Sequence, residues 1–334
     1  MLRFPLEMTS RIAGYVAKKK ITKAERFPMV LMLEPLHACN LTCTGCGRIR
    51  EYETTIKQKL SIQECLDAVD ECGAPVVSIC GGEPMIYPGI GELTAKILER
   101  KKVVYLCTNG MFTKKKINDF KPSNRFFFNV HLDGLRESHD LAVERKGVFD
   151  SAIEGIKVAK AAGFMVCTNT TVFTETNMAE LDAMYAYLTE LGVDGFMISP
   201  GYSYAAVESK EMFMTRDDIR AKFRQAEAMF RKYKFSTSPV FLEFLQGQRE
   251  MTCTAWGNPT RNVKGWKGPC YLITDIHHNS FDDLLNKTPW EKYGPGKDPR
   301  CENCMVHSGF EASAALGVNG KLGDTFKMLK WQFV

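Results

Sequence analysis

A short apolar segment runs directly into three closely spaced cysteines in the stretch Met29-Val-Leu-Met-Leu-Glu-Pro-Leu-His-Ala-Cys39-Asn-Leu-Thr-Cys43-Thr-Gly-Cys46. The apolar part, Met29–Pro35, predicts a buried strand, so the CX3CX2C loop follows the carboxyl end of that strand. Structural zinc sites and closed iron–sulfur clusters use four protein ligands, whereas Cys39, Cys43 and Cys46 supply three thiolates. The spacing therefore predicts a [4Fe–4S] cluster with one iron open to a small molecule. The alternatives are incidental thiols, or two members of a remote zinc site.

Strand and helix patterns alternate along the first two thirds of the chain. This order predicts an α/β fold in which a parallel sheet curls into a partial (β/α)6, TIM-like barrel, with its active face at the carboxyl ends of the strands. The predicted strands are Met29–Pro35, Val76–Gly82, Val103–Gly110, Arg125–Gly134, Val166–Thr174 and Gly195–Ser203. The predicted helices are Ser61–Cys72, which opens with a capping box, Ile90–Arg100, Asp150–Ala162, Met178–Leu191 and Thr215–Lys232.

Three regions follow from these patterns. Residues 1–28 form a basic helix and lead-in, residues 29–235 form the barrel, and residues 236–334 form a separate, loop-rich extension that contains four cysteines.

The composition is that of an ordinary globular protein. The 334 residues are 45% hydrophobic and 25% charged with a mean hydropathy of −0.20, and no apolar run approaches the ~18 residues of a membrane span. Since no signal-peptide pattern is present, we expect a soluble, cytosolic protein. Its 12 cysteines then indicate metal or redox chemistry rather than disulfides.

The N-terminal segment Leu6–Lys20 has Met8, Ile12, Tyr15 and Val16 along one side and a basic end. This pattern fits a helix that lies on the cytoplasmic face of a membrane, and it also fits a helix packed on the outside of the barrel.

Alternation along the strands separates polar from apolar side chains. In Phe128–Gly134, the residues Phe128, Val130 and Leu132 alternate with polar ones, and successive side chains of a strand point to opposite faces. The apolar set packs under helices, so the polar set faces the barrel interior and lines a ligand site. The alternative is that these polar groups only satisfy one another. The interior set is Glu34, Ser78, Cys80, Tyr105, Cys107, Asn109, Asn129, His131, Asp133, Cys167, Asn169 and Ser199.

The cysteine loop, together with Gly81-Gly82-Glu83-Pro84 after the second strand, resembles the radical S-adenosylmethionine (SAM) superfamily. The resemblance implies that the open iron binds the methionine part of SAM and that one electron cleaves SAM to methionine and a 5′-deoxyadenosyl radical. Gly81 and Gly82 let the backbone approach this ligand, and Glu83 can pair with its ammonium group. Many members have an aromatic residue where Gly45 stands, so contact with the adenine must come from elsewhere. Candidates for binding the nucleoside are Asn109, Asn129, His131 and Asp133, with Asn169 and Ser199 supported by parity alone.

Four longer stretches resemble the adenosyl-hopene transferases, a group of radical SAM enzymes in hopanoid biosynthesis. This resemblance implies transfer of the 5′-deoxyadenosyl group to the terminal alkene of hopene (diploptene), a hydrophobic triterpene. It also implies an electron donor such as flavodoxin or ferredoxin, and no nucleic-acid partner. The stretches are Arg26–Leu36, Cys39–Arg48, Ser78–Pro88 and Cys301–His307.

The chemistry of that reaction suggests a role for Cys107. Addition of a primary carbon radical to a terminal alkene leaves a tertiary radical, which must receive a hydrogen atom, and a thiol is a good donor. Cys107 has interior parity near the active end, while Cys80 and Cys167 share the parity on other strands. For all three, packing as small buried hydrophobes is the alternative.

The extension carries a second group of cysteines: Cys253, then Gly265 and Cys270, then Cys301-Glu-Asn-Cys304. The pattern resembles the CX9–15GX4C element with which some radical SAM enzymes hold an auxiliary [4Fe–4S] cluster. A four-thiolate zinc site and unligated thiols are the alternatives.

Two rival functions remain at this point. One is another radical SAM enzyme, such as a peptide-modifying enzyme with an auxiliary cluster. The other is a non-enzymatic iron–sulfur or zinc module that binds nucleic acid. The GGEP element and the near balance of 39 acidic and 44 basic residues argue against the module.

Overall fold

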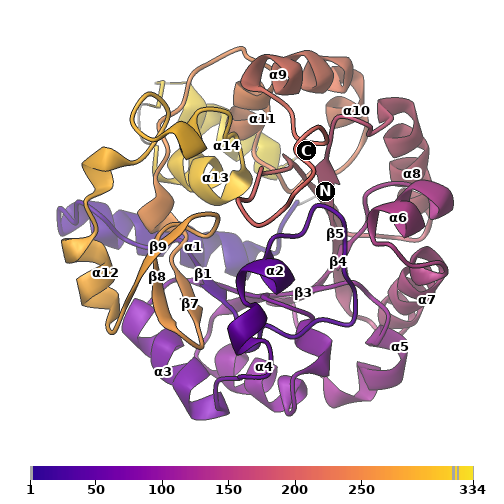
Figure 1. Ribbon diagram of the computed structural model, residues 1–334, viewed down its shortest axis with the longest axis horizontal. Helices are drawn as coiled ribbons and strands as arrows, with labels where there is room; N and C mark the ends of the chain where they lie inside the picture. Colours follow the sequence, from indigo (N-terminus) through magenta and orange to yellow (C-terminus); the bar gives the residue numbers. More distant parts are fainter. Residues whose placement is uncertain (1–2, 318–319, 322, 334) are drawn as a thin grey trace.

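The computed structural model describes residues 3–317, 320–321 and 323–333, and the strands in this part of the chain form one nine-stranded sheet (Figure 1). The order is β6-β5-β4-β3-β2-β1-β7-β8-β9; β1 to β6 are parallel, β7 pairs parallel with β1, and β8 and β9 are antiparallel. The predicted α/β partial barrel is therefore confirmed. The strands are β1 (Val30–Leu33), β2 (Val76–Ile79), β3 (Val103–Thr108), β4 (Phe126–His131), β5 (Met165–Val172), β6 (Gly195–Pro200), β7 (Thr260–Asn262), β8 (Gly265–Pro269) and β9 (Thr274–His278).

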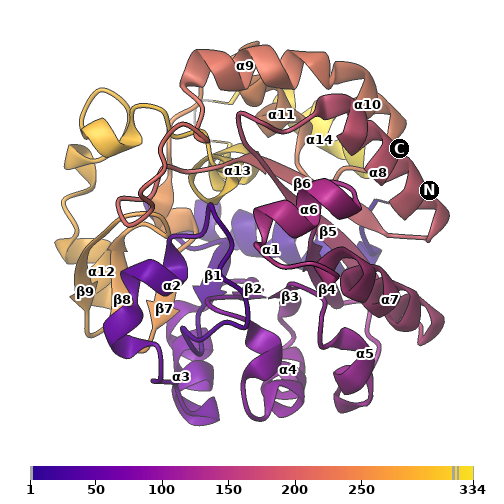
Figure 2. The same ribbon diagram turned by 45° about the vertical axis from the view of Figure 1, so that its right-hand side comes forward.

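Helices surround the barrel strands (Figure 2). The predicted helix Thr215–Lys232 divides at Ala226, where the backbone turns with φ −90° and ψ 3°. The α-helices are α1 (Leu6–Ile21), α2 (Arg48–Glu51), α3 (Ile62–Cys72), α4 (Ile90–Glu99), α5 (Thr113–Lys116), α6 (Arg136–Ala142), α7 (Val148–Ala161), α8 (Met178–Glu190), α9 (Arg216–Gln225), α10 (Glu227–Lys232), α11 (Pro239–Leu245), α12 (Phe281–Lys287), α13 (His307–Leu316) and α14 (Asp324–Gln332). Single 3-10 turns occupy Glu53–Thr55, Pro84–Ile86, Ile117–Asp119, Ala255–Gly257, Trp290–Lys292 and Pro299–Cys301.

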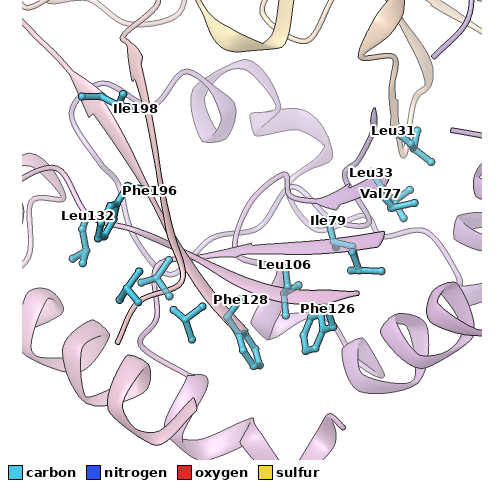
Figure 3. Packing of buried hydrophobic residues seen from close by; sticks show 14 of the residues in the cluster. Leu31, Leu33, Val77, Ile79, Leu106, Phe126, Phe128, Leu132, Phe196 and Ile198 are labelled. Carbon is cyan, nitrogen blue, oxygen red and sulfur yellow. The ribbon is translucent and has the colours of Figure 1, made fainter. Parts of the chain in front are cut away.

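The main hydrophobic core lies between the sheet and the outer helices (Figure 3). Val77, Ile79, Leu106, Phe126 and Phe128 belong to it and are fully buried. They alternate along β2 to β4 with the side chains that the parity analysis assigns to the interior. The predicted division of these strands into two faces is thus confirmed.

The concave face of the sheet has its own apolar cluster at the amino ends of the strands. Met8 of α1 is buried there with Val103, Tyr105, Phe127 and Cys167. The prediction of a consistently polar interior is therefore wrong at this end, because α1 needs an apolar surface to pack on. The lining becomes polar only toward the carboxyl ends.

The extension continues the barrel sheet, which differs from the separate unit that the sequence predicts. β7 pairs with β1 through Met32 opposite Thr260 and Leu33 opposite Arg261. The strands that join the sheet, β7 to β9, have only three to five residues each, too few for a periodic pattern to be recognised. Among the described residues, no helix has the length and apolarity to cross a bilayer.

Candidate active site

The CX3CX2C loop leaves β1 at the carboxyl end of the sheet and is held by hydrogen bonds from outside it. The Glu83 N–H donates to the Ala38 carbonyl at 2.9 Å. The Arg50 guanidinium donates to the carbonyl oxygens of Cys43 at 3.1 Å and Cys46 at 2.5 Å. These contacts fix the path of the loop on both sides of its cysteines.

The three thiols of this loop lie close together, and two of them have raised pKa values. Burial raises the pKa of Cys39 to about 11. Burial, with the neighbouring Cys46 and Cys39, raises the pKa of Cys43 further. A bound cluster reverses this preference, because thiolates are the ligating form. Three mutually close, partly exposed thiols fit a [4Fe–4S] cluster with one open iron.

The two glycines of the GGEP element lie against the cysteine loop. A Cβ on Gly82 would overlap the Ala38 carbonyl. A Cβ on Gly81, which has φ +105°, would lie 2.6 Å from the Leu36 carbonyl oxygen. Both positions therefore require glycine for the approach of this loop, which is a reason the sequence alone does not reveal.

Glu83 is 2% exposed, and its carboxylate accepts three hydrogen bonds. The donors are the Met85 N–H, the Thr108 hydroxyl and the Asn109 N–H, each at 2.8 Å. Burial raises the pKa of Glu83 to about 6 in spite of them. The carboxylate thus ties the turn after β2 to the end of β3, and its pairing with the SAM ammonium group stays a prediction.

Asn109 connects the end of β3 with the cysteine loop. Its Nδ2 donates to Asn40 Oδ1 at 2.9 Å, and its Oδ1 accepts from the Met111 N–H at 3.1 Å. Asn40 is a residue that the sequence analysis missed, although its position between Cys39 and Cys43 is a signal that could have found it.

Cys107 lies on the concave face between two polar neighbours. Its Sγ is 3.3 Å from Ser78 Oγ and accepts a hydrogen bond from Asn129 Nδ2 at 3.5 Å. Burial raises the pKa of Cys107 against these two hydrogen bonds, so the side chain is a thiol at neutral pH. The amide oxygen of Asn129 is buried and has no partner among the described residues.

His131 and Asp133 form a pair at the carboxyl end of β4, with His131 Nε2 and Asp133 Oδ2 2.7 Å apart. Asp133 Oδ1 accepts from the Thr171 N–H at 2.7 Å, which fixes the carboxylate to β5. Burial alone would lower the pKa of His131, but Asp133 raises it above its ordinary value. The same carboxylate also raises the pKa of Cys43, which shows that the pair lies near the cysteine loop.

The two weaker candidates have different surroundings. Ser199 Oγ accepts from the His307 N–H at 3.2 Å, so it joins β6 to the start of α13. The backbone carbonyl of Asn169 accepts from the Leu132 N–H at 3.0 Å. These contacts are structural, and a nucleoside-binding role for either residue stays a prediction.

The four cysteines of the extension line one cavity. Cys304, Cys270 and Cys301 all raise the pKa of Cys253, after the larger effect of burial. The Leu272 and Ile273 N–H groups donate to Cys270 Sγ at 3.4 and 3.3 Å. Four gathered thiols fit the predicted second site for an iron–sulfur cluster. No three His, Cys, Asp or Glu side chains in the described part of the chain have the geometry for a single metal ion.

A buried ionic group, missed by the sequence analysis, lies beside β1. Arg48 Nε is 3.3 Å from Glu34 Oε1, and Arg48 Nη1 is 3.3 Å from Glu51 Oε2. Lys267 Nζ, from β8, is 3.3 Å from Glu51 Oε1. Burial lowers the pKa of Lys267 to about 8. Two cations and two carboxylates thus compensate one another in a largely buried group.

Arg48 also links the two cysteine groups. It follows Cys46 by two residues, and its guanidinium carbon lies 3.9 Å from the centroid of the Tyr271 ring, next to Cys270. A second link to the cavity of the extension runs through Tyr204. The ring of Tyr204 is 5.1 Å from that of Tyr202, and Tyr202 lines this cavity.

The radical SAM superfamily model matches residues 33–188, the region that holds the cysteine loop, the GGEP element and Cys107. The match supports a radical SAM barrel in this region. A second family model, a domain of unknown function (DUF3463), matches residues 196–328. The prediction of a [4Fe–4S] cluster and SAM as cofactors is confirmed by the superfamily.

Known proteins with similar sequences carry different activities. The GTP 3′,8-cyclase of Ectopseudomonas mendocina is 26% identical over 63% of this chain and 66% of its own. The Fe-coproporphyrin III synthase of Methanosarcina barkeri is 29% identical over 46% of this chain and 39% of its own. The chain thus spans less than two thirds of the length of either relative. Among solved structures, Streptococcus suis SuiB bound to the precursor peptide SuiA shares the fold, with a TM-score of 0.64, 16% identity, and 90% of this chain and 76% of SuiB covered.

Proposed function

We propose that the protein is an adenosylhopane synthase, which joins the 5′-deoxyadenosyl group of SAM to the terminal alkene of hopene. The observation that carries this proposal is the position of Cys107. Its thiol stands at the boundary between the polar and apolar halves of the concave face, with Ser78 and Asn129 beside it and Tyr105 below it. A hydrocarbon bound against the apolar half would present its end to this thiol.

The atom and electron balance of the proposed reaction assigns a role to Cys107. When bound, the cluster supplies the electron that cleaves SAM to methionine and the 5′-deoxyadenosyl radical. A new carbon–carbon bond to the alkene leaves a tertiary carbon radical. Cys107 gives its hydrogen atom to that carbon, and the resulting thiyl radical is reduced by one electron from an external donor such as flavodoxin or ferredoxin and takes one proton from solvent. The raised pKa of Cys107 keeps the S–H bond that this step requires.

The four-cysteine cavity favours a second candidate, a peptide-modifying radical SAM enzyme. An auxiliary cluster in that cavity would accept an electron from an oxidised peptide. Hopene addition consumes a hydrogen atom rather than releasing an electron, so the two reactions differ in the direction of electron flow.

The test is anaerobic reconstitution with SAM, a reductant and hopene, followed by mass analysis of the products. The parent enzyme should form a saturated adduct. Cys107→Ala should still cleave SAM and still form the carbon–carbon bond, but its products should be unsaturated or rearranged. Cys80→Ala and Cys167→Ala are matched controls that share the parity of Cys107. A parent that forms no adduct would contradict the proposal, and a saturated adduct from Cys107→Ala would contradict the role of the thiol.

A further inference from the structure

The described part of the chain has seven large hydrophobic side chains that are strongly exposed, and five of them lie on or directly after two helices. These five are 55% to 81% exposed, and they are Leu6 and Ile21 of α1 and Phe326, Leu329 and Phe333 of the α14 segment. The α14 residues recur at intervals of three and four, so they lie along one outward face of the helix. We call these five residues and the exposed cations beside them the α1/α14 surface.

The amino end of α1 meets the carboxyl end of α14, although the two helices are at opposite ends of the sequence. Phe4 and Trp331 have ring centroids 5.3 Å apart, and Gln332 Nε2 donates to the Phe4 carbonyl at 2.9 Å. At the other end of α1, Lys20 Nζ lies near the C-cap of α13, where a Cβ on Gly317 would be 3.7 Å away. Figures 1 and 2 also show the two ends of the chain close together. The exposed apolar residues therefore lie on two helices that meet at one end.

The charges on this surface have a consistent sign. Lys18, Lys20 and Lys330 are exposed and have no carboxylate partner among the described residues. The acidic side chains of the same helices already have cationic partners: Glu7 pairs with Arg11 at 3.0 Å, and Asp324 pairs with Arg249 at 2.7 Å. Apolar side chains flanked by free cations match the surface of an anionic bilayer, whose headgroups attract lysine and whose acyl region accepts phenylalanine and leucine.

We propose that the α1/α14 surface docks the protein onto an anionic phospholipid bilayer. The inward side of α1 supports this arrangement. Met8 packs on the apolar end of the concave face, so α1 covers that end. This part of the proposal rests on the proposed function: a bilayer at this surface would hold a water-insoluble triterpene one helix away from the apolar half of the site.

The test is co-sedimentation of the anaerobically purified full chain with large vesicles that contain no triterpene. One vesicle population is phosphatidylcholine alone, and the other contains 30 mol% phosphatidylglycerol, roughly the anionic content that polybasic surfaces require. The parent should bind the anionic vesicles at least about tenfold more tightly than the neutral ones. The triple variant Phe326→Ser, Leu329→Ser, Phe333→Ser should lose this binding, and Lys18→Gln, Lys20→Gln, Lys330→Gln should lose the preference for phosphatidylglycerol.

The matched control is Leu141→Ser with Ile276→Ser, which replaces the other two exposed hydrophobic side chains and should bind like the parent. Equal binding by the parent and the triple serine variant would overturn the proposal. So would a parent that is a dimer in solution and becomes monomeric in that variant, because the surface would then contact a second copy of the chain. Since no substrate is present, these results are independent of whether hopene is adenosylated.

Discussion

The two cysteine groups differ in the number of thiols they provide and in how many segments of the chain supply them. Cys39, Cys43 and Cys46 come from one loop, and the chain places three thiols at the carboxyl end of the barrel without a fourth. The second group gathers four thiols from three separate segments around a largely apolar cavity. Three ligands leave a coordination position for SAM, whereas four close the site. The comparison teaches that the number of cysteines separates a reactive site from an enclosed one.

The largest effect is expected at the first group. Replacing Cys39, Cys43 or Cys46 by Ala should reduce SAM cleavage to the background of protein without a cluster, because two thiolates no longer hold the cluster in place. The measurement is 5′-deoxyadenosine formed after anaerobic reconstitution. Cys65→Ala and Cys72→Ala, at buried core thiols, should retain cleavage. Cleavage retained in all three loop variants would show that the cluster is elsewhere.

The link between the groups provides the second test. Arg48→Met leaves the buried carboxylate of Glu34 without its main compensating cation and removes one of the two cations beside Glu51, which should lower the free energy of unfolding by about 3–5 kcal/mol. Denaturant unfolding of the reduced, metal-free chain measures this change. Arg136→Met is the matched control, since its exposed pair with Asp150 should contribute less than about 1 kcal/mol. Equal losses of unfolding free energy in the two variants would mean that the Arg48 ion pairs do not stabilise the junction between the two cysteine groups.

A third, smaller effect concerns pH near the second group. Burial raises the pKa of Glu311, on α13, from an ordinary 4.5 to about 7. Since the folded pKa exceeds the unfolded one, its stabilising contribution is complete below pH 4.5 and is lost as the pH rises through about 7. Relative to Glu311→Gln, the parent should lose up to about 3 kcal/mol between pH 5 and 8. If the free energies of unfolding of the two proteins change with pH in the same way, Glu311 does not have a raised pKa in the folded protein.

The smallest expected change is in metal content. If the second group holds a [4Fe–4S] cluster, iron should approach about eight atoms per chain in the parent and about four when Cys253, Cys270, Cys301 and Cys304 are all changed to Ser. Zinc would appear instead in elemental analysis if it is the occupant. Neither excess iron nor zinc in anaerobically purified protein would show that these thiols bind no metal.

The same contrast explains what the sequence could predict. The strand, the CX3CX2C loop and the GGEP element are local patterns, so their order along the chain predicts the barrel and the first site. Parity also places Ser78, Cys107 and Asn129 on one face correctly. Parity predicts which face of the sheet a side chain lies on, but not where along the strands that face changes from apolar to polar. For this reason the apolar cluster under α1 was missed.

Contacts between distant segments were beyond local patterns. Arg48 has no sequence signal that pairs it with Glu34 or stacks it on Tyr271, because those neighbours depend on how β8 and its following loop meet β1. The three short strands of the extension likewise have too few residues to show alternation. The contacts that the sequence could not predict therefore lie mainly where residues 236–334 meet the barrel.

The pairing of β7 with β1 has a consequence for synthesis of the protein. Asn262 follows Glu34 by 228 residues, and the two side chains meet beside β1 at 3.3 Å. Until the ribosome has released this late segment, the outer edge of β1 has no neighbour and exposes unpaired backbone groups that attract other strands. Pairings so distant in sequence also form slowly. The nascent chain therefore exposes the unpaired edge of β1, next to its first cysteine loop, during most of translation. Chaperone protection would be needed at this edge.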